Sequence, residues 1–150
     1  MNIGELCNRE VIIVERQESV LEAAKLMRKY HVGDVVVVEQ SGAESVPVGI
    51  LTDRDIVIEL VAKQVNAEKV AVGDAMSGEL LVAKEDGQLH ELIEQMQLKA
   101  VRRAPVVNAK GSLIGIVTMD DMIEVLAEQL GALASLVHRE QYQEQSKRVV

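Results

Sequence analysis

The chain has 150 residues, of which 48% are apolar, and its 24 acidic and 16 basic side chains give a net charge of −8. This length suits one domain or two small joined domains with a proper core. The negative charge argues against nucleic acid or an anionic membrane as the main partner, and two Tyr without Phe or Trp leave no platform for stacking single-stranded bases.

The single cysteine, Cys7, excludes an intramolecular disulfide and suits a reducing compartment. We expect it to be a small packed residue rather than a nucleophile, because no base partner is evident. The N-terminus lacks the charged and apolar regions of a signal peptide, and no apolar run reaches the roughly 18–20 residues that span a bilayer. The sequence therefore predicts a cytoplasmic protein.

One pattern occurs twice in the chain. Ile3-Gly4-Glu5 matches Val72-Gly73-Asp74, and Val35–Val38 matches 104–107, both at an offset of 69 residues. From Gly49 and Gly115 onward the offset is 66, because a loop in the second copy is three residues shorter. Surface loops tolerate such changes, so we expect two copies of one structural unit.

The first copy predicts a strand at 11–14, a helix at 19–30, and strands at 35–39 and 48–51. The helix has apolar residues at helical spacing and begins with the capping-box pattern Ser19-x-x-Glu22. A run of valines favours the second strand, because β-branched side chains pack well on a sheet. Residues 40–47 are interpreted as a long, loose turn, and residues 65–71, without Gly or Pro, as a packed linker.

The second copy predicts strands at 80–82, 105–108 and 113–117, with a helix at 88–99 before the second of them. Its final helix keeps apolar residues at helical spacing from Ile123 to Val137, which is more than the duplicated unit requires. This extra stripe either covers the first repeat or forms a self-association surface, and we weigh the two alike. From His138 onward the chain is polar and is expected to fray.

Each copy is therefore a β-α-β-β-α unit of about 60 residues, too small to be stable alone. We expect an α+β fold in which two repeats pack sheet-to-sheet and share a core. The expected boundaries are residues 1–64 for the first repeat, 65–71 for the linker, 72–130 for the second repeat and 131–150 for a helical extension with a polar tail.

Both copies end in the same motif, Gly-aliphatic-aliphatic-Thr-x-x-Asp, which reads Gly49-Ile50-Leu51-Thr52-Asp53-Arg54-Asp55 in the first and Gly115-Ile116-Val117-Thr118-Met119-Asp120-Asp121 in the second. The pattern predicts a buried strand that turns into a helix N-terminus. A hydroxyl and a carboxylate there can bind a ligand, but they are also what an ordinary helix cap uses.

The duplicated unit and its end motif resemble the CBS (cystathionine beta-synthase) domain, and the tandem is similar to a Bateman module. The resemblance covers roughly residues 3–130. It implies a pseudo-twofold pair whose central cleft binds an adenosine-containing ligand such as AMP, ADP, ATP, S-adenosylmethionine or NAD. It further implies a regulatory role without catalysis, an unknown protein target and, by default, a homodimer.

The resemblance also implies which residues bind. Thr52 and Asp55 would share a cleft with Arg102 and Arg103, since basic residues hold phosphate at the corresponding place in the gamma subunits of AMP-activated kinase. An Asp accepts from a ribose diol, and guanidinium groups bind phosphate. Leu81, Ala104 and Pro105 would line the adenine site of this cleft.

A second cleft would combine Thr118 and Asp121 with Gly33 and Asp34. The carboxylate of Asp34 would repel phosphate, so we expect this cleft to be empty or to take a neutral adenosyl group. The apolar residues that would line it are Ile13 and Val35.

Other chemistry has little support in the sequence. The three histidines are far apart, so no metal site is expected, and no nucleophile–base pair or P-loop is present. We therefore expect no catalytic residues. The alternative hypothesis is a ligand-free, dimerising protein-interaction scaffold, and the chain as a regulatory fragment of a larger protein stays open.

Overall fold

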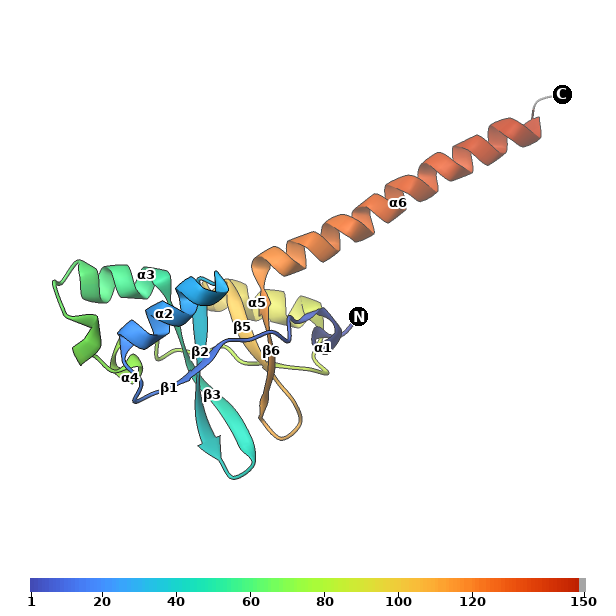
Figure 1. Ribbon diagram of the computed structural model, residues 1–150. Helices are drawn as coiled ribbons and strands as arrows, with labels where there is room; N and C mark the ends of the chain where they lie inside the picture. Colours follow the sequence, from blue (N-terminus) through green and yellow to red (C-terminus); the bar gives the residue numbers. More distant parts are fainter. Residues whose placement is uncertain (149–150) are drawn as a thin grey trace. The chain divides into compact units, whose positions relative to one another are not determined.

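The computed structural model describes residues 1–148, with side chains to residue 147 (Figure 1). The chain divides into two compact units, Met1–Val117 and the segment from Thr118 onward, and each is described by itself. Among the described residues, no helix combines the length and the apolar character that crossing a membrane demands.

The first repeat has the predicted β-α-β-β-α order, preceded by a short helix that was not predicted. Its elements are α1 (Ile3–Leu6), β1 (Ile13–Glu15), α2 (Val20–Tyr30), β2 (Asp34–Ser41), β3 (Glu44–Thr52), α3 (Asp53–Ile56) and the π-helical turn η1 (Val57–Val61). The interpretation of residues 40–47 as a loose turn is wrong. Ser41 pairs with Glu44 across a tight hairpin in which Gly42 has φ +61°, a conformation that glycine adopts without strain.

The second repeat repeats this order. Its elements are α4 (Val72–Ala75), β4 (Ala83–Lys84), α5 (Leu89–Lys99), β5 (Arg103–Val107), β6 (Leu113–Thr118) and α6 (Met119–Arg148). The strand predicted at 80–82 is wrong, because the pairing with β5 begins only at Ala83, opposite Val106. Leu80 and Leu81 precede the strand and are free to line a pocket.

Each repeat forms a three-stranded sheet, ordered β1-β2-β3 and β4-β5-β6. β1 runs parallel to β2, and β2 runs antiparallel to β3, with Val36 opposite Ile50. The central strand has a four-valine run that is entirely buried, as expected for a strand covered on both faces. One face carries Val35 and Val37 into a core with α2, and the other carries Val36 and Val38.

The two sheets pack against each other. Val36 and Val38 of β2 form a buried cluster with Ile116 of β6, and Val11 and Leu113 pack at its edge. Successive strand residues point to opposite faces, so one valine run supplies both the helix-facing core and the inter-sheet contact. The expected α+β fold with sheet-to-sheet packing is confirmed.

The repeats also exchange their N-terminal segments. The amide of Gly4 donates to the Glu85 carbonyl at 2.8 Å, and the amide of Gly73 donates to the Arg16 carbonyl at 2.9 Å. These bonds are related by the 69-residue offset (4 to 73, 16 to 85), so the exchange follows the pseudo-twofold relation. Each short first helix is therefore held by the other repeat, which the sequence analysis did not predict.

The glycine of the repeated motif lies where the exchanged segments cross the sheets. A Cβ at Gly49 would lie 2.4 Å from the sulfur of Met76, and one at Gly115 would lie 2.6 Å from the sulfur of Cys7. Cys7 and Met76 are themselves equivalent (7 to 76). Glycine makes room at both positions for the close approach of the other repeat.

The linker is packed, as expected. Residues 67–69 form a 3-10 turn, and the amide of Val20 donates to the Val70 carbonyl at 2.9 Å. Ala67 and Val70 pack against the core of the first repeat. The connection between the repeats is thus part of the folded structure.

The second unit consists almost entirely of α6, which is helical from Met119 to Arg148. The expectation that the chain frays from His138 is wrong for the described residues. The polar segment is rich in Glu, Gln, Lys and Arg, which are strong helix formers and explain the continuation. Gly131 does not interrupt the helix.

Candidate functional site

The end motif of the first repeat forms a capped helix start. Asp55 donates its amide to the Thr52 hydroxyl at 3.0 Å, and the amide of Thr52 donates to the Asp55 carboxylate at 3.0 Å. This reciprocal pair is a capping box, which holds both side chains in fixed positions. The hydroxyl proton of Thr52 and the second carboxylate oxygen of Asp55 have no role in the cap and are suited to a ligand.

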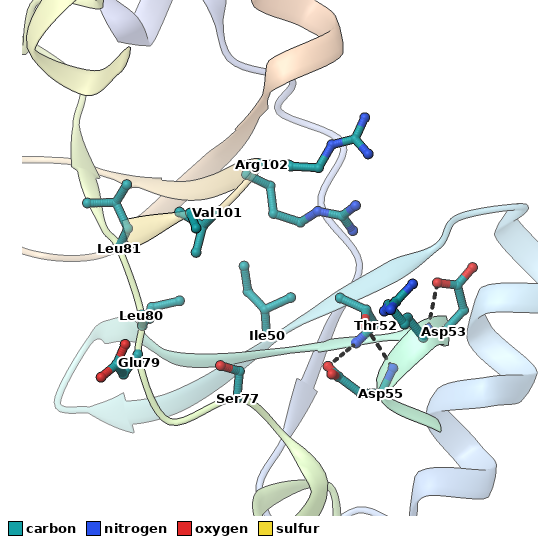
Figure 2. Close-up of a pocket in the computed structure, with 13 residues that line it drawn as sticks. Ile50, Thr52, Asp53, Asp55, Ser77, Glu79, Leu80, Leu81, Val101 and Arg102 are labelled. Atoms are coloured by element: carbon teal, nitrogen blue, oxygen red, sulfur yellow. Dashed lines mark hydrogen bonds between the residues drawn. The ribbon is translucent and has the colours of Figure 1, made fainter. Parts of the chain in front are cut away.

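A pocket of about 430 Å³ opens beside this cap, within the usual size range of small-molecule sites. The first repeat contributes Ile50 and the segment 52–55 to its lining. The second repeat contributes residues 77, 79–81 and 100–103. Figure 2 shows Leu80 and Leu81 on one wall and Thr52 and Asp55 on another, with Ile50 between them.

The pocket joins the two polar groups that the sequence analysis placed together. Thr52 is the last residue of β3 and Asp55 lies in α3, which follows directly. Arg103 is the first residue of β5, and Arg102 immediately precedes it. The lining contains three arginines and three acidic side chains, with Arg54, Asp53 and Glu79 completing these sets. One end can therefore accept hydrogen bonds from hydroxyl groups, and another can hold an anion.

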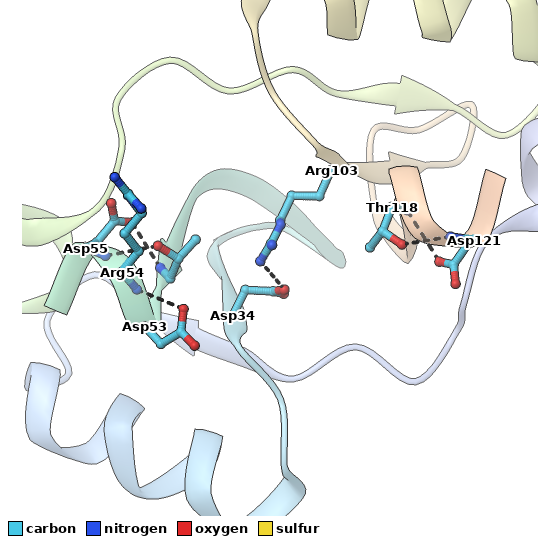
Figure 3. Close-up of polar contacts among 8 residues, drawn as sticks. Asp34, Asp53, Arg54, Asp55, Arg103, Thr118 and Asp121 are labelled. Carbon is cyan, nitrogen blue, oxygen red and sulfur yellow. Dashed lines mark hydrogen bonds and ion pairs between the residues drawn. The ribbon is translucent and has the colours of Figure 1, made fainter. Parts of the chain in front are cut away.

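Arg103 is held in place by Asp34. Its Nη1 donates to Asp34 Oδ2 at 2.5 Å, and the two side chains are only 31% and 21% exposed (Figure 3). Burial raises the pKa of the Asp34 carboxyl above its ordinary value. The charge and the hydrogen bond of Arg103 oppose that rise, and the nearby Asp53 adds to it.

The sequence analysis assigned Asp34 and Arg103 to two different clefts, but the structure pairs them directly. They occupy equivalent positions, each the first residue of the central strand of its sheet (34 to 103). Equivalent residues meet where a pseudo-twofold axis passes. The opposite charges of the aligned pair are a weak signal in the sequence, because Glu15 with Lys84 and Lys25 with Glu94 show the same pattern.

The end motif of the second repeat forms the same cap. The Asp121 amide donates to the Thr118 hydroxyl at 3.2 Å, and the Thr118 amide donates to the Asp121 carboxylate at 3.3 Å. Both residues belong to the second unit, which begins at Thr118. The second expected cleft therefore stays a prediction.

Of the apolar residues predicted to contact adenine, only some lie where a ligand could reach them. Leu81 lines the pocket, whereas Ala104 and Pro105 are buried within β5 and are not part of its lining. Val35 is fully buried in the core of the first repeat, and Ile13 is 46% exposed. The sequence analysis did not predict that Ile50, Ser77 and Val101 line the pocket, because their position there depends on how the two repeats pack.

Two further features bear on reactivity. Burial raises the pKa of the Cys7 thiol, so less thiolate is present at neutral pH, as expected for a packed residue. Within residues 1–148, no cluster of three or more His, Cys, Asp or Glu side chains is arranged to hold a metal ion.

Comparison with protein families matches the CBS domain at residues 3–62 and again at 72–128. The chain therefore belongs to the CBS domain family and is a CBS pair, the regulatory module of that family. It is 38% identical to an uncharacterised protein of Methanopyrus kandleri over 125 residues, which are 83% of this chain and 62% of that protein. It is 30% identical to the CBS domain-containing protein YhcV of Bacillus subtilis, covering 92% and 96% of the two chains.

A match to the inosine-5'-monophosphate dehydrogenase of Methanocaldococcus jannaschii has 32% identity and covers 80% of this chain but only 22% of the enzyme. Among solved structures, Hypoxic Response Protein I with two coordinated zinc ions has a TM-score of 0.72 at 27% identity, covering 83% and 98% of the chains. A CBS pair in complex with 5'-methylthioadenosine and S-adenosyl-L-methionine has a TM-score of 0.73 at 23% identity, covering 86% and 98%. This last likeness shows the fold.

Proposed function

We propose that this CBS pair is a non-catalytic sensor that binds an adenine nucleotide, AMP, ADP or ATP, in the pocket between its repeats. One observation carries the proposal. The pocket brings a fixed carboxylate, Asp55, from one repeat together with Arg102 and Arg103 from the other. A nucleotide carries a ribose diol and a phosphate, and this pocket has complementary groups for both.

The proposed contacts follow from the lining. Asp55 accepts hydrogen bonds from the ribose hydroxyls, and Thr52 donates its hydroxyl proton to a phosphate oxygen. Arg102 and Arg103 bind the phosphate. The adenine packs against the apolar wall formed by Ile50, Leu80, Leu81 and Val101, in place of the predicted Ala104 and Pro105. The solved CBS pair that holds adenosyl compounds supports the ligand class.

Such a ligand would regulate by bridging the repeats. It contacts residues of both, so it favours the arrangement in which those residues are correctly spaced. The shift is limited to the difference in its affinity for the two arrangements. The protein that reads this change is unidentified. We propose that the protein acts in the cytoplasm.

Calorimetric titration of the nucleotide-stripped chain with AMP, ADP, ATP, S-adenosylmethionine and NAD tests the proposal. Asp55→Asn is the informative variant, because its amide oxygen still accepts from the Thr52 amide while the carboxylate charge is lost. We expect AMP affinity to fall at least about tenfold, by the loss of a charge-assisted pair of hydrogen bonds. Asp121→Asn is the matched control in the other copy. A folded chain that binds none of the five compounds would refute the sensor and favour the protein-interaction scaffold.

We further propose that the protein is a homodimer paired through α6. Ile123, Leu130 and Val137 alternate with Leu126 and Leu133 at spacings of three and four residues, and all five are 45–69% exposed. We call these five residues the α6 stripe. Mostly β-branched residues at one heptad position and leucine at the other favour a two-stranded coiled coil with a second copy. Leu136, 60% exposed, borders the stripe.

A further inference from the structure

A carboxylate beside the pocket competes with a bound phosphate for one of the pocket's arginines. Arg103 lines the pocket, but its guanidinium donates to Asp34, which is not part of the lining. The carboxylate of Asp34 thus approaches Arg103 from outside the space that a ligand would occupy. A phosphate that takes the same guanidinium must share it with Asp34 or displace it.

Displacement of Asp34 is unfavourable because of where this carboxylate lies. Its side chain is 21% exposed, so water only partly replaces Arg103 as its partner. Asp53, at the start of α3, is the other charged group that acts on it, and it is also negative. Separation from Arg103 therefore leaves the Asp34 carboxylate near a second acidic side chain without the cation that pairs with it.

We propose that Asp34 is a specificity-determining residue of the nucleotide pocket, which weakens binding of phosphate-bearing ligands by competing for Arg103. This inference rests on the nucleotide-binding function proposed above. It predicts that Asp34 lowers the affinity for AMP while leaving that for adenosine unchanged, since adenosine has no phosphate to compete for the guanidinium. The pocket would then bind AMP only at concentrations high enough for its phosphate to compete with Asp34 for Arg103.

The experiment is a calorimetric comparison of AMP and adenosine binding to the full-length wild-type chain and Asp34→Asn. We expect AMP to bind Asp34→Asn roughly fivefold or more tightly, as for the loss of a partly exposed ion pair, and adenosine to bind both alike. Asp34→Glu, which keeps the charge, should bind AMP as the wild type does. Glu94→Gln on α5 removes one negative charge from an exposed position outside the pocket lining and controls for net charge.

Each other result is decisive. Equal AMP affinity of wild type and Asp34→Asn overturns the inference and leaves the sensor intact. Weaker AMP binding by Asp34→Asn also overturns it and makes Asp34 a positioning residue for Arg103. An equal gain in Glu94→Gln attributes the effect to net charge and overturns it as well. If neither AMP nor adenosine binds any of the proteins, the proposed function fails and the inference with it. Circular dichroism of each variant establishes that it is folded.

Discussion

The helices that follow the two end motifs begin alike and end differently. Thr52 with Asp55 and Thr118 with Asp121 make the same reciprocal cap. After α3, however, the first repeat passes into a π-helical turn and reaches a left-handed residue at Gln64, whereas α6 remains helical to Arg148. The motif determines how a helix starts, and the sequence beyond it determines where the helix ends.

The two repeats also differ in how their motif glycines are enclosed, and substitution there should have the largest effect. A Cβ at Gly115 would lie 2.8 Å from the backbone carbonyl oxygen of Asn8, which cannot move easily, whereas Gly49 faces the flexible side chain of Met76. We expect Gly115→Ala to lower the free energy of unfolding by about 3 kcal/mol and Gly49→Ala by about 1 kcal/mol. Urea unfolding measures both.

Gly78→Ala provides the control, because nothing lies within 4 Å of a Cβ there. It should leave stability nearly unchanged. A larger loss for Gly49→Ala than for Gly115→Ala would contradict the view that backbone contact makes the second copy less tolerant.

The second prediction concerns the unequal lengths of the helices. Leu130 of the α6 stripe corresponds to Gln64 in the first repeat (64 to 130), so only the second copy has an apolar side chain there. We expect Leu130→Glu to weaken dimerisation at least about tenfold, because it places a charge in an apolar seam. Sedimentation equilibrium measures the effect. Ser135→Glu adds the same charge to α6 outside the stripe and should leave the dimer intact. A monomeric wild type would contradict pairing through the α6 stripe.

The third prediction tests whether the two caps are energetically alike. The Thr52 cap has the shorter hydrogen bonds, 3.0 Å against 3.2 and 3.3 Å at Thr118. Thr52→Ala should cost about 1 kcal/mol in urea unfolding, and Thr118→Ala somewhat less. The Thr→Ser variants keep the hydroxyl and should be close to wild type. A greater cost at Thr118 would reverse the ranking.

The smallest effect concerns Asp34 and Arg103, equivalent residues of opposite charge that pair across the two repeats. The pKa of Asp34 is raised by burial, so the folded protein holds this proton more firmly than the unfolded chain does. Its contribution to stability is therefore present below the ordinary pKa of Asp, about 4, and is lost as pH rises through the raised value. Asp34→Asn should stabilise the chain slightly at pH 7, by less than about 0.5 kcal/mol, and not at pH 3. Destabilisation at pH 7 in thermal unfolding would show that Arg103 outweighs burial.

Local sequence patterns predicted most of the fold. The valine run, the capped helix α2 and the twin end motifs allowed the order of the elements along each repeat to be predicted, because each depends on nearby residues. The β2–β3 hairpin was missed because its polar residues resemble a loop until they are seen paired. The full length of α6 was missed because polarity does not prevent a helix built from strong helix formers.

The candidate site was predicted in part for a similar reason. The resemblance brought Thr52, Asp55, Arg102 and Arg103 together, and all four line one pocket. The pairing of Arg103 with Asp34 and the burial of Pro105 depend on how two sheets meet, which no local pattern contains. The close contact at Gly115 was invisible for the same reason, although the repetition of that glycine was plain.

The exchange of N-terminal segments bears on how the chain can fold and how it can be divided. The backbone of Gly4 is hydrogen-bonded to the second repeat and that of Gly73 to the first. Each repeat therefore depends on the other for part of its packing. The chain should unfold in one cooperative transition across residues 1–117. Two fragments separated within residues 65–71 should be poorly folded alone and should reconstitute the structure when mixed. A single repeat made in isolation would need a second copy of itself to bind its N-terminal segment. The duplication thus joins in one polypeptide two units that would otherwise have to form a symmetric dimer.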